Sequence, residues 1–513
     1  MSTFFPATGS LSSANAPGRI NRMIACFAIG KLLLHFAANS NYGLHADELY
    51  YIALSDHPQW GYLDNGPLIT WMVKLSSAIF GTGLFAWRLL PSTCAALMVV
   101  FTGKMTQRLG GGKMAVTLAC TAMLCSPAFT ATSYLLQPVI FDQFFWTAIT
   151  YSLLSYRQSG KDSYLFTASV LTGLGILNKY SILLFLLFFV LPFLWKSRLA
   201  QRSRTLILPV LLILIIVLPN ILWQYQHGFP GITYLQLVTH RQVYQGPGDF
   251  IFQLLFFHGA AMAVWLAGIA YLLTARDQMK VYRPAGYGFL ILLPALYLLN
   301  GKLYYLLGAF PFLFAAGGLC WEKMLTARPA VLKAALLSGM AAVGLIALPV
   351  VLPILPFGLM KRYLSLMHTY TPIDQPLRWD DGRVHALPQY FADMLAWQDL
   401  AKKVAEAKMA AVYTENYAAA AAIQYYSDGP PVQVFAKGNS FAEWSPPALP
   451  EELILITSEN PQQVRSLAEN VSLIADMDNH FATSGTLKVY LIKSPARSFS
   501  ARYRGLGRTS LMF

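Results

Sequence analysis

The chain has 513 residues, of which 56% are hydrophobic and only 12% are charged, whereas about 25% of the residues of soluble proteins are charged. Its mean hydropathy is +0.46. This composition excludes a disordered chain, a coiled coil and an ordinary soluble enzyme. Apolar runs of about 18 or more residues recur, and each is long enough to cross a bilayer as a helix. The sequence therefore predicts an α-helical polytopic membrane protein.

The net charge of +14 would suggest a nucleic-acid partner in a soluble protein. In a membrane protein, Lys and Arg instead concentrate in cytoplasmic loops, so we expect no nucleic-acid partner. The cysteines all lie in apolar segments, which gives no sign of a disulfide framework. They are Cys26, Cys94, Cys120, Cys125 and Cys320.

About eleven apolar segments are predicted to span the bilayer. In chain order they lie near 23–40, 84–107, 114–133, 139–156, 164–178, 180–195, 205–224, 250–273, 285–300, 304–321 and 331–352. The first segment follows a polar stretch, residues 1–22, and resembles a signal peptide only in part. We expect it to be retained as a helix because many spans follow. Residues 23–355 are thus predicted to form the transmembrane domain.

Lysine and arginine gather in the loops on the side of residues 1–22, which the positive-inside rule places in the cytoplasm. An odd number of spans then puts the C-terminus outside, in the periplasm if the membrane is a bacterial inner membrane. Three long outer segments result: 41–83, 225–249 and everything after about 353. The first is rich in aromatic residues, which predicts helices lying in the membrane interface.

Beyond about residue 370 the hydrophobic runs shorten and charged residues return. Strands are expected at 409–413, 453–457 and 487–493, with helices at 416–426 and 461–470. This alternation predicts a small α/β domain over 370–495. The remaining stretch, 496–513, is a basic tail rich in Ser and Gly, which we expect to be loosely ordered.

Acidic residues on the outer side are the first candidates for chemistry, because ionisable groups near lipid are costly unless they have a function. Asp47 and Glu48 follow the first span and point to different sides of a helix. One of them could act as a general base on an acceptor hydroxyl or amine. The alternative is that both are solvated acids at a helix N-terminus, where they favour the helix dipole.

Two further acids on the outer side could likewise have either a functional or a purely structural role. Tyr62 and Asp64 lie in a Gly- and Pro-flanked stretch, and we expect both to contact a substrate. The alternative is that Asp64 only forms a turn. Asp142 lies about one turn inside an otherwise apolar helix that Pro138 opens, and either joins the chemistry or caps the helix. Asp47, Asp64 and Asp142 are all expected on the same side of the membrane.

Cations on this side predict an anion-binding site, since this side normally avoids positive charge. Lys179 separates two spans, Arg241 lies in the second outer segment, and Lys302 precedes Tyr304 and Tyr305 at the start of another span. A lipid phosphate fits these charges. The alternative is that each cation extends to lipid headgroups without binding a substrate.

Acids for proton transfer, cations for phosphate and a long apolar wall together favour a transferase that uses a lipid-phosphate substrate. The sequence contains no GxGxxG after a strand, no P-loop, and no HExxH or CxxC motif, so a nucleotide cofactor and a dedicated zinc site are unsupported. Two other classes stay open: a transporter or flippase of lipid-linked sugars, and an assembly protein whose tail recruits a partner.

The motifs around these charges resemble those of bacterial GT-C glycosyltransferases, relatives of the protein O-mannosyltransferases and of the lipid A aminoarabinose transferase. In the first outer loop the resemblance rests on HADELYYIALSDHPQWGYLDNGPLITWMVKLSSAIFG and WRLLPS. It continues in QPVIFDQFFWT, GLGILNKYSILL, GKLYYLLGAFPFLFAAG, VYTENYAAAAAIQYY, NSFAEWSPP and LILIT. It spans most of the chain and is most specific in the first loop.

The resemblance implies a GT-C fold and an enzyme that transfers a sugar from a polyprenyl phosphate, with inversion at the anomeric carbon. The acceptor would lie in the periplasm and would be lipid A or another glycolipid, a polysaccharide or a protein. Asp47 matches the acid proposed as catalytic in the family, and Asp142 matches a second acid. Lys179, Arg241 and Lys302 match only by their loops. No cofactor is required, although some relatives bind a divalent metal. Where relatives often have Asp-His-Pro-Pro, this chain has Asp64-Asn65-Gly66-Pro67.

Overall fold

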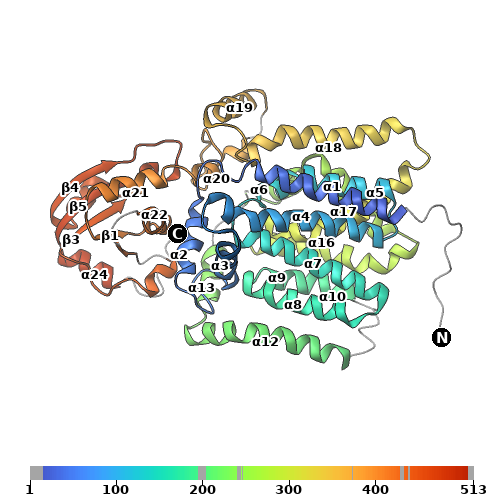
Figure 1. The fold of residues 1–513 in the computed structure, drawn as a ribbon, viewed down its shortest axis with the longest axis horizontal. Helices are drawn as coiled ribbons and strands as arrows, with labels where there is room; N and C mark the ends of the chain where they lie inside the picture. Colours follow the sequence, from blue (N-terminus) through green and yellow to red (C-terminus); the bar gives the residue numbers. More distant parts are fainter. Residues whose placement is uncertain are drawn as a thin grey trace.

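The computed structural model describes residues 16–194, 204–239, 244, 246–371, 374–427, 432–436 and 439–505. A bundle of roughly parallel helices forms one part, and a sheet with its own helices forms the other (Figure 1). The helices of the bundle are α1 (Ala16–Phe36), α4 (Leu84–Arg108), α5 (Lys113–Cys125), α7 (Pro138–Ser159), α8 (Asp162–Asn178), α9 (Ile182–Phe185), α10 (Leu191–Leu194), α12 (Arg204–Gln226), α14 (Pro247–Phe256), α15 (Met262–Thr274), α16 (Arg283–Leu298), α17 (Phe310–Leu325) and α18 (Ala330–Val351).

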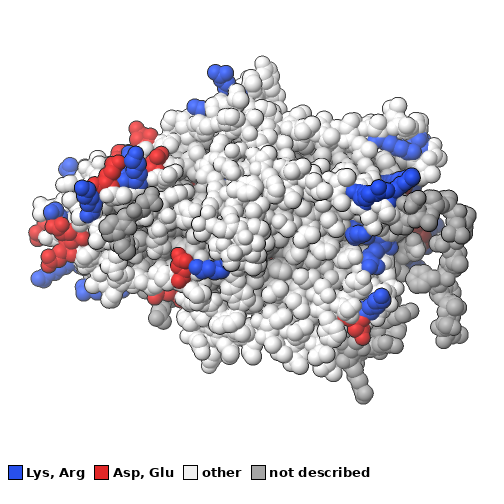
Figure 2. All heavy atoms as spheres, in the orientation of Figure 1, with Lys and Arg blue, Asp and Glu red and all other residues white. Residues whose placement is uncertain are grey.

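The bundle has the properties of a membrane domain. In the described part of the chain, five helices are long and apolar enough to cross a membrane. They are Leu84–Arg108, Leu206–Gln226, Gln278–Leu298, Leu303–Leu325 and Ala330–Val351. On the face shown in Figure 2, charged side chains gather toward the two ends of the molecule, and the surface between them is almost free of charge. An uncharged surface of this kind fits the hydrocarbon layer of a bilayer. Together with the five apolar helices it makes the chain a multi-pass membrane protein.

Two predicted spans are broken in the structure. The segment predicted at 114–133 divides at Ser126 into α5 and the short α6 (Pro127–Ala131), because Pro127 cannot continue the hydrogen bonding of α5. The segment predicted at 250–273 bends by 98° between α14 and α15. At this bend Gly259 has a positive φ of 54° and the buried His258 ring hydrogen-bonds Ser126 at 2.8 Å. The total of eleven spans stays a prediction.

Short helices lie between the bundle and the sheet (Figure 1). They are α2 (Ala46–Ser55), α3 (Leu68–Phe80) and α13 (Pro230–Thr239). We call this end of the bundle the sheet end. Helix α19 (Phe357–Tyr370), the 3-10 turn Gln375–Leu377 and α20 (Gln389–Ala392) then lead from α18 into the C-terminal part of the chain.

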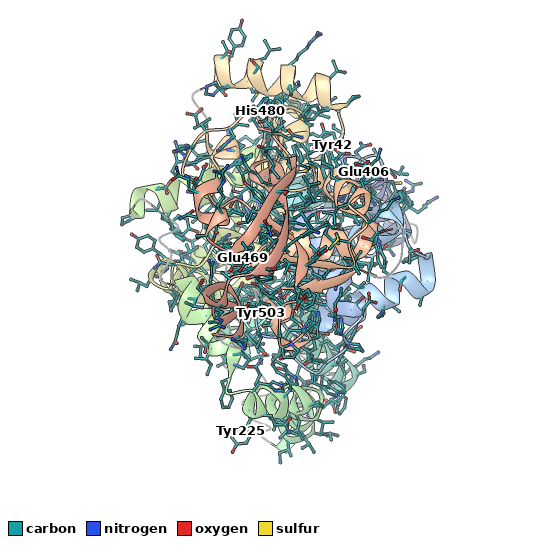
Figure 3. The ribbon with its side chains drawn as sticks, turned by 90° about the vertical axis from the view of Figure 1, so that its left-hand side faces the viewer. Tyr42, Tyr225, Glu406, Glu469, His480 and Tyr503 are labelled. Atoms are coloured by element: carbon teal, nitrogen blue, oxygen red, sulfur yellow. The ribbon has the colours of Figure 1, made fainter. Side chains whose placement is uncertain are left out.

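The C-terminal part is built on a five-stranded sheet of order β2-β1-β3-β5-β4. The strands are β1 (Ala411–Thr414), β2 (Gln433–Phe435), β3 (Glu452–Thr457), β4 (Ala468–Asp476) and β5 (Lys488–Pro495). Strands β2, β1 and β3 are parallel, whereas β5 is antiparallel to both β3 and β4. Figure 3 looks onto this sheet in front of the bundle, with Glu469 labelled on β4 and Tyr225 at the edge of the view, near the end of α12.

Helices cover both faces of this sheet. On the face toward the bundle lie α21 (Trp397–Glu406) and α22 (Tyr417–Tyr426), which share one hydrophobic core with the bundle. On the other face lie α23 (Pro461–Arg465) and α24 (Arg497–Gly505). The central strand β3 is therefore buried on both faces, from Leu453 to Ile456. The shared core makes the sheet domain continuous with the sheet end of the bundle.

Two sequence expectations for this domain were wrong. The helix expected at 461–470 ends at Arg465, and Ala468 begins the edge strand β4, which pairs with β5. The tail expected to be loosely ordered is helical over Arg497–Gly505, where Phe499 and Tyr503 are buried against the sheet. Residues 506–513 lie outside the described part of the chain.

Candidate active site at the sheet end

Helix α2 begins with a capping box that fixes the orientation of both predicted acids. The ring Nδ1 of His45 accepts a hydrogen bond from the Asp47 amide at 3.0 Å. The Glu48 carboxylate accepts one from the His45 amide at 3.0 Å. Such reciprocal bonds satisfy amides at the start of a helix that would otherwise have no partner. Asp47 is left partly exposed, whereas Glu48 is fully buried.

Glu48 forms a buried ion pair with Arg88 of α4. The guanidinium donates twice to the carboxylate, at 3.1 and 2.7 Å, and neither side chain is exposed. Burial alone would raise the pKa of Glu48, but the charge and hydrogen bonds of Arg88 hold this pKa below its usual range. Glu48 also accepts the Leu136 amide at 3.0 Å. It therefore joins α2 to α4 and to the segment that precedes α7.

The Asp47 carboxylate is held by one donor on each oxygen. Gln137 donates its side-chain amide to Oδ2 at 3.1 Å, and the Tyr417 hydroxyl donates to Oδ1 at 2.7 Å. Gln137 directly follows Leu136, whose amide donates a hydrogen bond to Glu48. The two adjacent acids thus have different situations: Glu48 is enclosed by partners, whereas Asp47 is oriented and still partly accessible.

Tyr417 comes from α22 of the sheet domain. This helix begins at Tyr417, directly after its cap Asn416, whose side chain accepts hydrogen bonds from the amides of Ala418 and Ala419. It continues with a fully buried alanine run, Ala418–Ala422. Small side chains allow α22 to pack closely on α2, which brings the starts of the two helices together. Burial and the charge of Asp47 raise the pKa of the Tyr417 hydroxyl well above its usual value, so it remains a proton donor.

Asp64 is the second partly exposed acid of the first outer loop. It accepts hydrogen bonds from the Tyr50 hydroxyl at 2.9 Å, the Asn439 side chain at 2.9 Å and the Ser440 hydroxyl at 3.1 Å. Burial raises the pKa of Asp64 to about 6, although the Tyr50 and Ser440 donors act in the opposite direction. Tyr62 is wholly buried, and its hydroxyl donates to the carbonyl of His57 at 2.9 Å. This hydrogen bond joins two parts of the first outer loop.

Asp142 and Lys179 lie close together where α7 and α8 meet. Asn178, the last residue of α8, donates to the Pro138 carbonyl at the start of α7 at 2.9 Å. This places Lys179 within electrostatic range of Asp142. Asp142 is 4% exposed and accepts hydrogen bonds at 3.1 Å from both Trp146 and Ser181. Asp142 is therefore a nearly buried acid whose nearest charge is a cation.

Two tyrosines connect this pair to Asp47. The Lys179 ammonium lies 5.1 Å from the ring centre of Tyr304 and 4.1 Å from that of Tyr305. Both rings belong to the 3-10 turn Leu303–Ala309. Tyr304 is within electrostatic range of Asp47, and Tyr305 is within range of Lys302, which is exposed. The structure thus brings together six of the predicted residues: Asp47, Asp142, Lys179, Lys302, Tyr304 and Tyr305.

The remaining predicted residues differ in their access to this group. Glu48 and Tyr62 have no exposed surface to offer a substrate. Asp64 belongs to the contact between the first loop and the sheet domain and is also within electrostatic range of Tyr417, the donor to Asp47. Arg241 lies outside the described residues. Within the described ranges no group of three or more His, Cys, Asp or Glu side chains could hold a metal ion.

Sequence reasoning did not single out Gln137 or Tyr417. Gln137 was part of a quoted motif but carries no charge, and Tyr417 lies 370 residues from Asp47 in the chain. Tyr417 also lies in a quoted motif, VYTENYAAAAAIQYY, where it precedes an alanine run, a composition that predicts a closely packed buried helix.

Comparisons with known proteins agree with this architecture. Residues 56–223 match the family described as dolichyl-phosphate-mannose-protein mannosyltransferase. The fold is similar to that of ArnT from Cupriavidus metallidurans bound to undecaprenyl phosphate, with a TM-score of 0.61 and 12% identity over 93% of this chain and 98% of that chain. The apo form of the same protein gives a TM-score of 0.61 and 14% identity, over 92% and 98%. No curated protein sequence matches this chain.

Proposed function

We propose that the chain is a GT-C glycosyltransferase that transfers a sugar from a polyprenyl phosphate to an acceptor. Its ArnT-like fold and the match of residues 56–223 to the protein mannosyltransferase family support this proposal. The ArnT structure with bound undecaprenyl phosphate supports a donor of this kind. The acceptor would be an envelope glycolipid, a glycan or a protein. The active site would face the periplasm of a bacterial inner membrane, together with the sheet domain.

The observation that carries the proposal is the Asp47 carboxylate. It is partly exposed, it lies in the loop that follows the first bundle helix, and each of its oxygens is held by a donor. A general base needs a fixed position and access to the proton that it takes. Glu48 meets the first condition but not the second, so its role would be to support Asp47 through α2 and Leu136.

Lys179 is the best-placed cation for the donor phosphate. Its ammonium lies over two tyrosine rings, and within the described residues no carboxylate is close enough to form a salt bridge with it. Lys302 would meet the phosphate from the exposed side. A positive charge here would stabilise the negative charge that grows on the leaving phosphate. Arg241 is kept as a third candidate by sequence alone.

The proposed reaction is a single displacement. The acceptor hydroxyl or amine loses its proton to Asp47 as its lone pair forms a bond to the anomeric carbon. The bond from this carbon to the phosphate oxygen breaks, and its electron pair leaves with the lipid phosphate. One displacement inverts the anomeric centre and requires no covalent enzyme intermediate. Asp142, next to Lys179, would keep the polar network of the site in place.

The test follows release of undecaprenyl phosphate by the purified protein in lipid vesicles, with undecaprenyl-phosphate sugars and an envelope extract. We expect release by the wild type and a loss of at least about a hundredfold in Asp47→Asn, the range of a missing general base. Asp56→Asn is the matched control, because Asp56 lies in the same loop, is 70% exposed, and among the described residues forms an ion pair only with Lys74. It should behave as the wild type does.

Other outcomes would contradict the proposal in separate ways. If no donor released lipid phosphate while labelled lipid crossed the bilayer, the chain would be a transporter, the alternative that intramembrane charges also fit. An Asp47→Asn variant as active as the wild type would leave the transferase in place and remove Asp47 as its base.

A further inference from the structure

The sheet domain supplies hydrogen bonds to both partly exposed acids of the first outer loop. Tyr417 donates to Asp47, and Asn439 and Ser440 donate to Asp64. The contact continues outside the acids, where the rings of His57 and Trp444 stack with centres 4.3 Å apart. A domain that only recruited a partner would have no need to contact these carboxylates.

Tyr417 is held firmly in its position. It is the first residue of α22, directly after the Asn416 cap. Its ring lies 5.0 Å from that of Tyr50 on α2, in an edge-on arrangement. The alanine run that follows is fully buried between α2 and the sheet, so the hydroxyl cannot leave Asp47 without a movement of the side chain or of the domain.

We infer that Tyr417 is a positioning residue of the active site, and that the sheet domain is therefore part of the catalytic unit. The hydroxyl of Tyr417 fixes Oδ1 of Asp47, while Gln137 fixes Oδ2. Each carboxylate oxygen can accept more than one hydrogen bond, so a lone pair remains for the proton of the acceptor. This inference rests on the proposed transferase function.

Several groups besides Tyr417 act on Asp47 through their charge or dipole. They are Tyr51 of α2, Tyr304 of the 3-10 turn, and Asp393, which precedes α21. Asp393 is a second acid near Asp47, whereas Gln137 and Tyr417 are the donors that hold the Asp47 carboxylate in place. Loss of the Tyr417 donor should therefore leave Oδ1 of Asp47 without this restraint, so that the base is less well placed for the acceptor.

The test is the steady-state kinetics of Tyr417→Phe, which removes only the hydroxyl. We expect kcat to fall about tenfold while KM for the donor changes by less than about twofold, because a displaced base slows the chemical step and leaves donor binding unchanged. Tyr425→Phe is the matched control: it removes a hydroxyl from the same helix, one that accepts from Trp87 at 3.3 Å and does not contact Asp47. Its kcat and KM should match those of the wild type.

A second variant keeps the test decisive if Tyr417→Phe does not fold. Replacement of Tyr417 by 4-fluorophenylalanine keeps the ring and fills the space of the hydroxyl but removes the donor, so kcat should fall in the same way. A folded variant of either kind with the kcat of the wild type would overturn the inference and leave the transferase function intact. A wild type that releases no lipid phosphate from any donor would overturn both.

Discussion

At the scale of single residues, the adjacent acids Asp47 and Glu48 differ in what surrounds them. Both could be proposed for catalysis from the sequence, because adjacent helical positions point to different sides. The sequence could not predict which acid would be enclosed, since the partner, Arg88, lies 40 residues away. Tyr62 was expected to contact a substrate, but it is buried and its hydroxyl donates to the loop backbone at His57.

Glu48→Gln should destabilise the protein by about 3–5 kcal/mol, because it leaves the Arg88 guanidinium buried without its counter-ion. The free energy of unfolding in detergent micelles measures this effect. The surface pair of Asp56 and Lys74, which are 70% and 54% exposed, provides the comparison. Asp56→Asn should cost less than about 1 kcal/mol. Equal effects of the two substitutions would mean that the buried pair does not support α2.

At the scale of elements, the sequence predicts long helices from their continuous apolar runs, but it does not predict where a helix bends. The span expected at 331–352 corresponds to Ala330–Val351, and that at 84–107 to Leu84–Arg108. Hydropathy does not register the bend between α14 and α15, because both halves are apolar. The edge strand β4 was also missed, since most of its residues are exposed and its pattern gives no burial signal.

The departure from the family pattern in the first loop has a structural reason at Gly66. A Cβ atom there would lie 2.2 Å from the carbonyl oxygen of Leu177 and 2.9 Å from that of Asn178. The loop backbone therefore packs directly on the end of α8, next to Lys179. Glycine allows this approach and other residues do not.

Gly66→Ala should push the first loop away from α8 and lower kcat/KM for the donor by about tenfold or more, because small displacements of positioned groups have large effects on rate. Transfer assays with labelled donor measure the change. Gly358→Ala is the control, since a Cβ there meets nothing within 4 Å. A Gly66→Ala enzyme with wild-type kinetics would show that this close packing does not position the site.

At the scale of the whole molecule, the bundle and the sheet domain meet at the first outer loop. Asp64 is at the centre of this contact, with one donor from the loop and two from the sheet domain. The sequence predicted an outer α/β domain but could not predict this contact, because it joins Asp64 to residues more than 370 positions away. Only the folded chain places these partners together.

The contact should depend on pH in a direction set by Asp64. Burial raises its pKa to about 6 from an ordinary value of 3.8. Between these values the folded protein keeps a proton that the unfolded chain has lost, so stability falls as pH rises from about 4 to about 6 and is level above that range. Asp64→Asn cannot ionise and should lack this part of the dependence.

Thermal unfolding in detergent between pH 4 and pH 7 measures the effect as a difference between the wild type and Asp64→Asn. The difference is needed because other groups titrate as well: burial also raises the pKa of Asp393, whereas Arg88 lowers that of Glu48. Both groups are unchanged in the variant. The wild type should therefore lose stability relative to Asp64→Asn as pH rises toward about 6. Parallel curves would mean that Asp64 is solvated in the folded protein, and that the sheet domain is held by its apolar contacts alone.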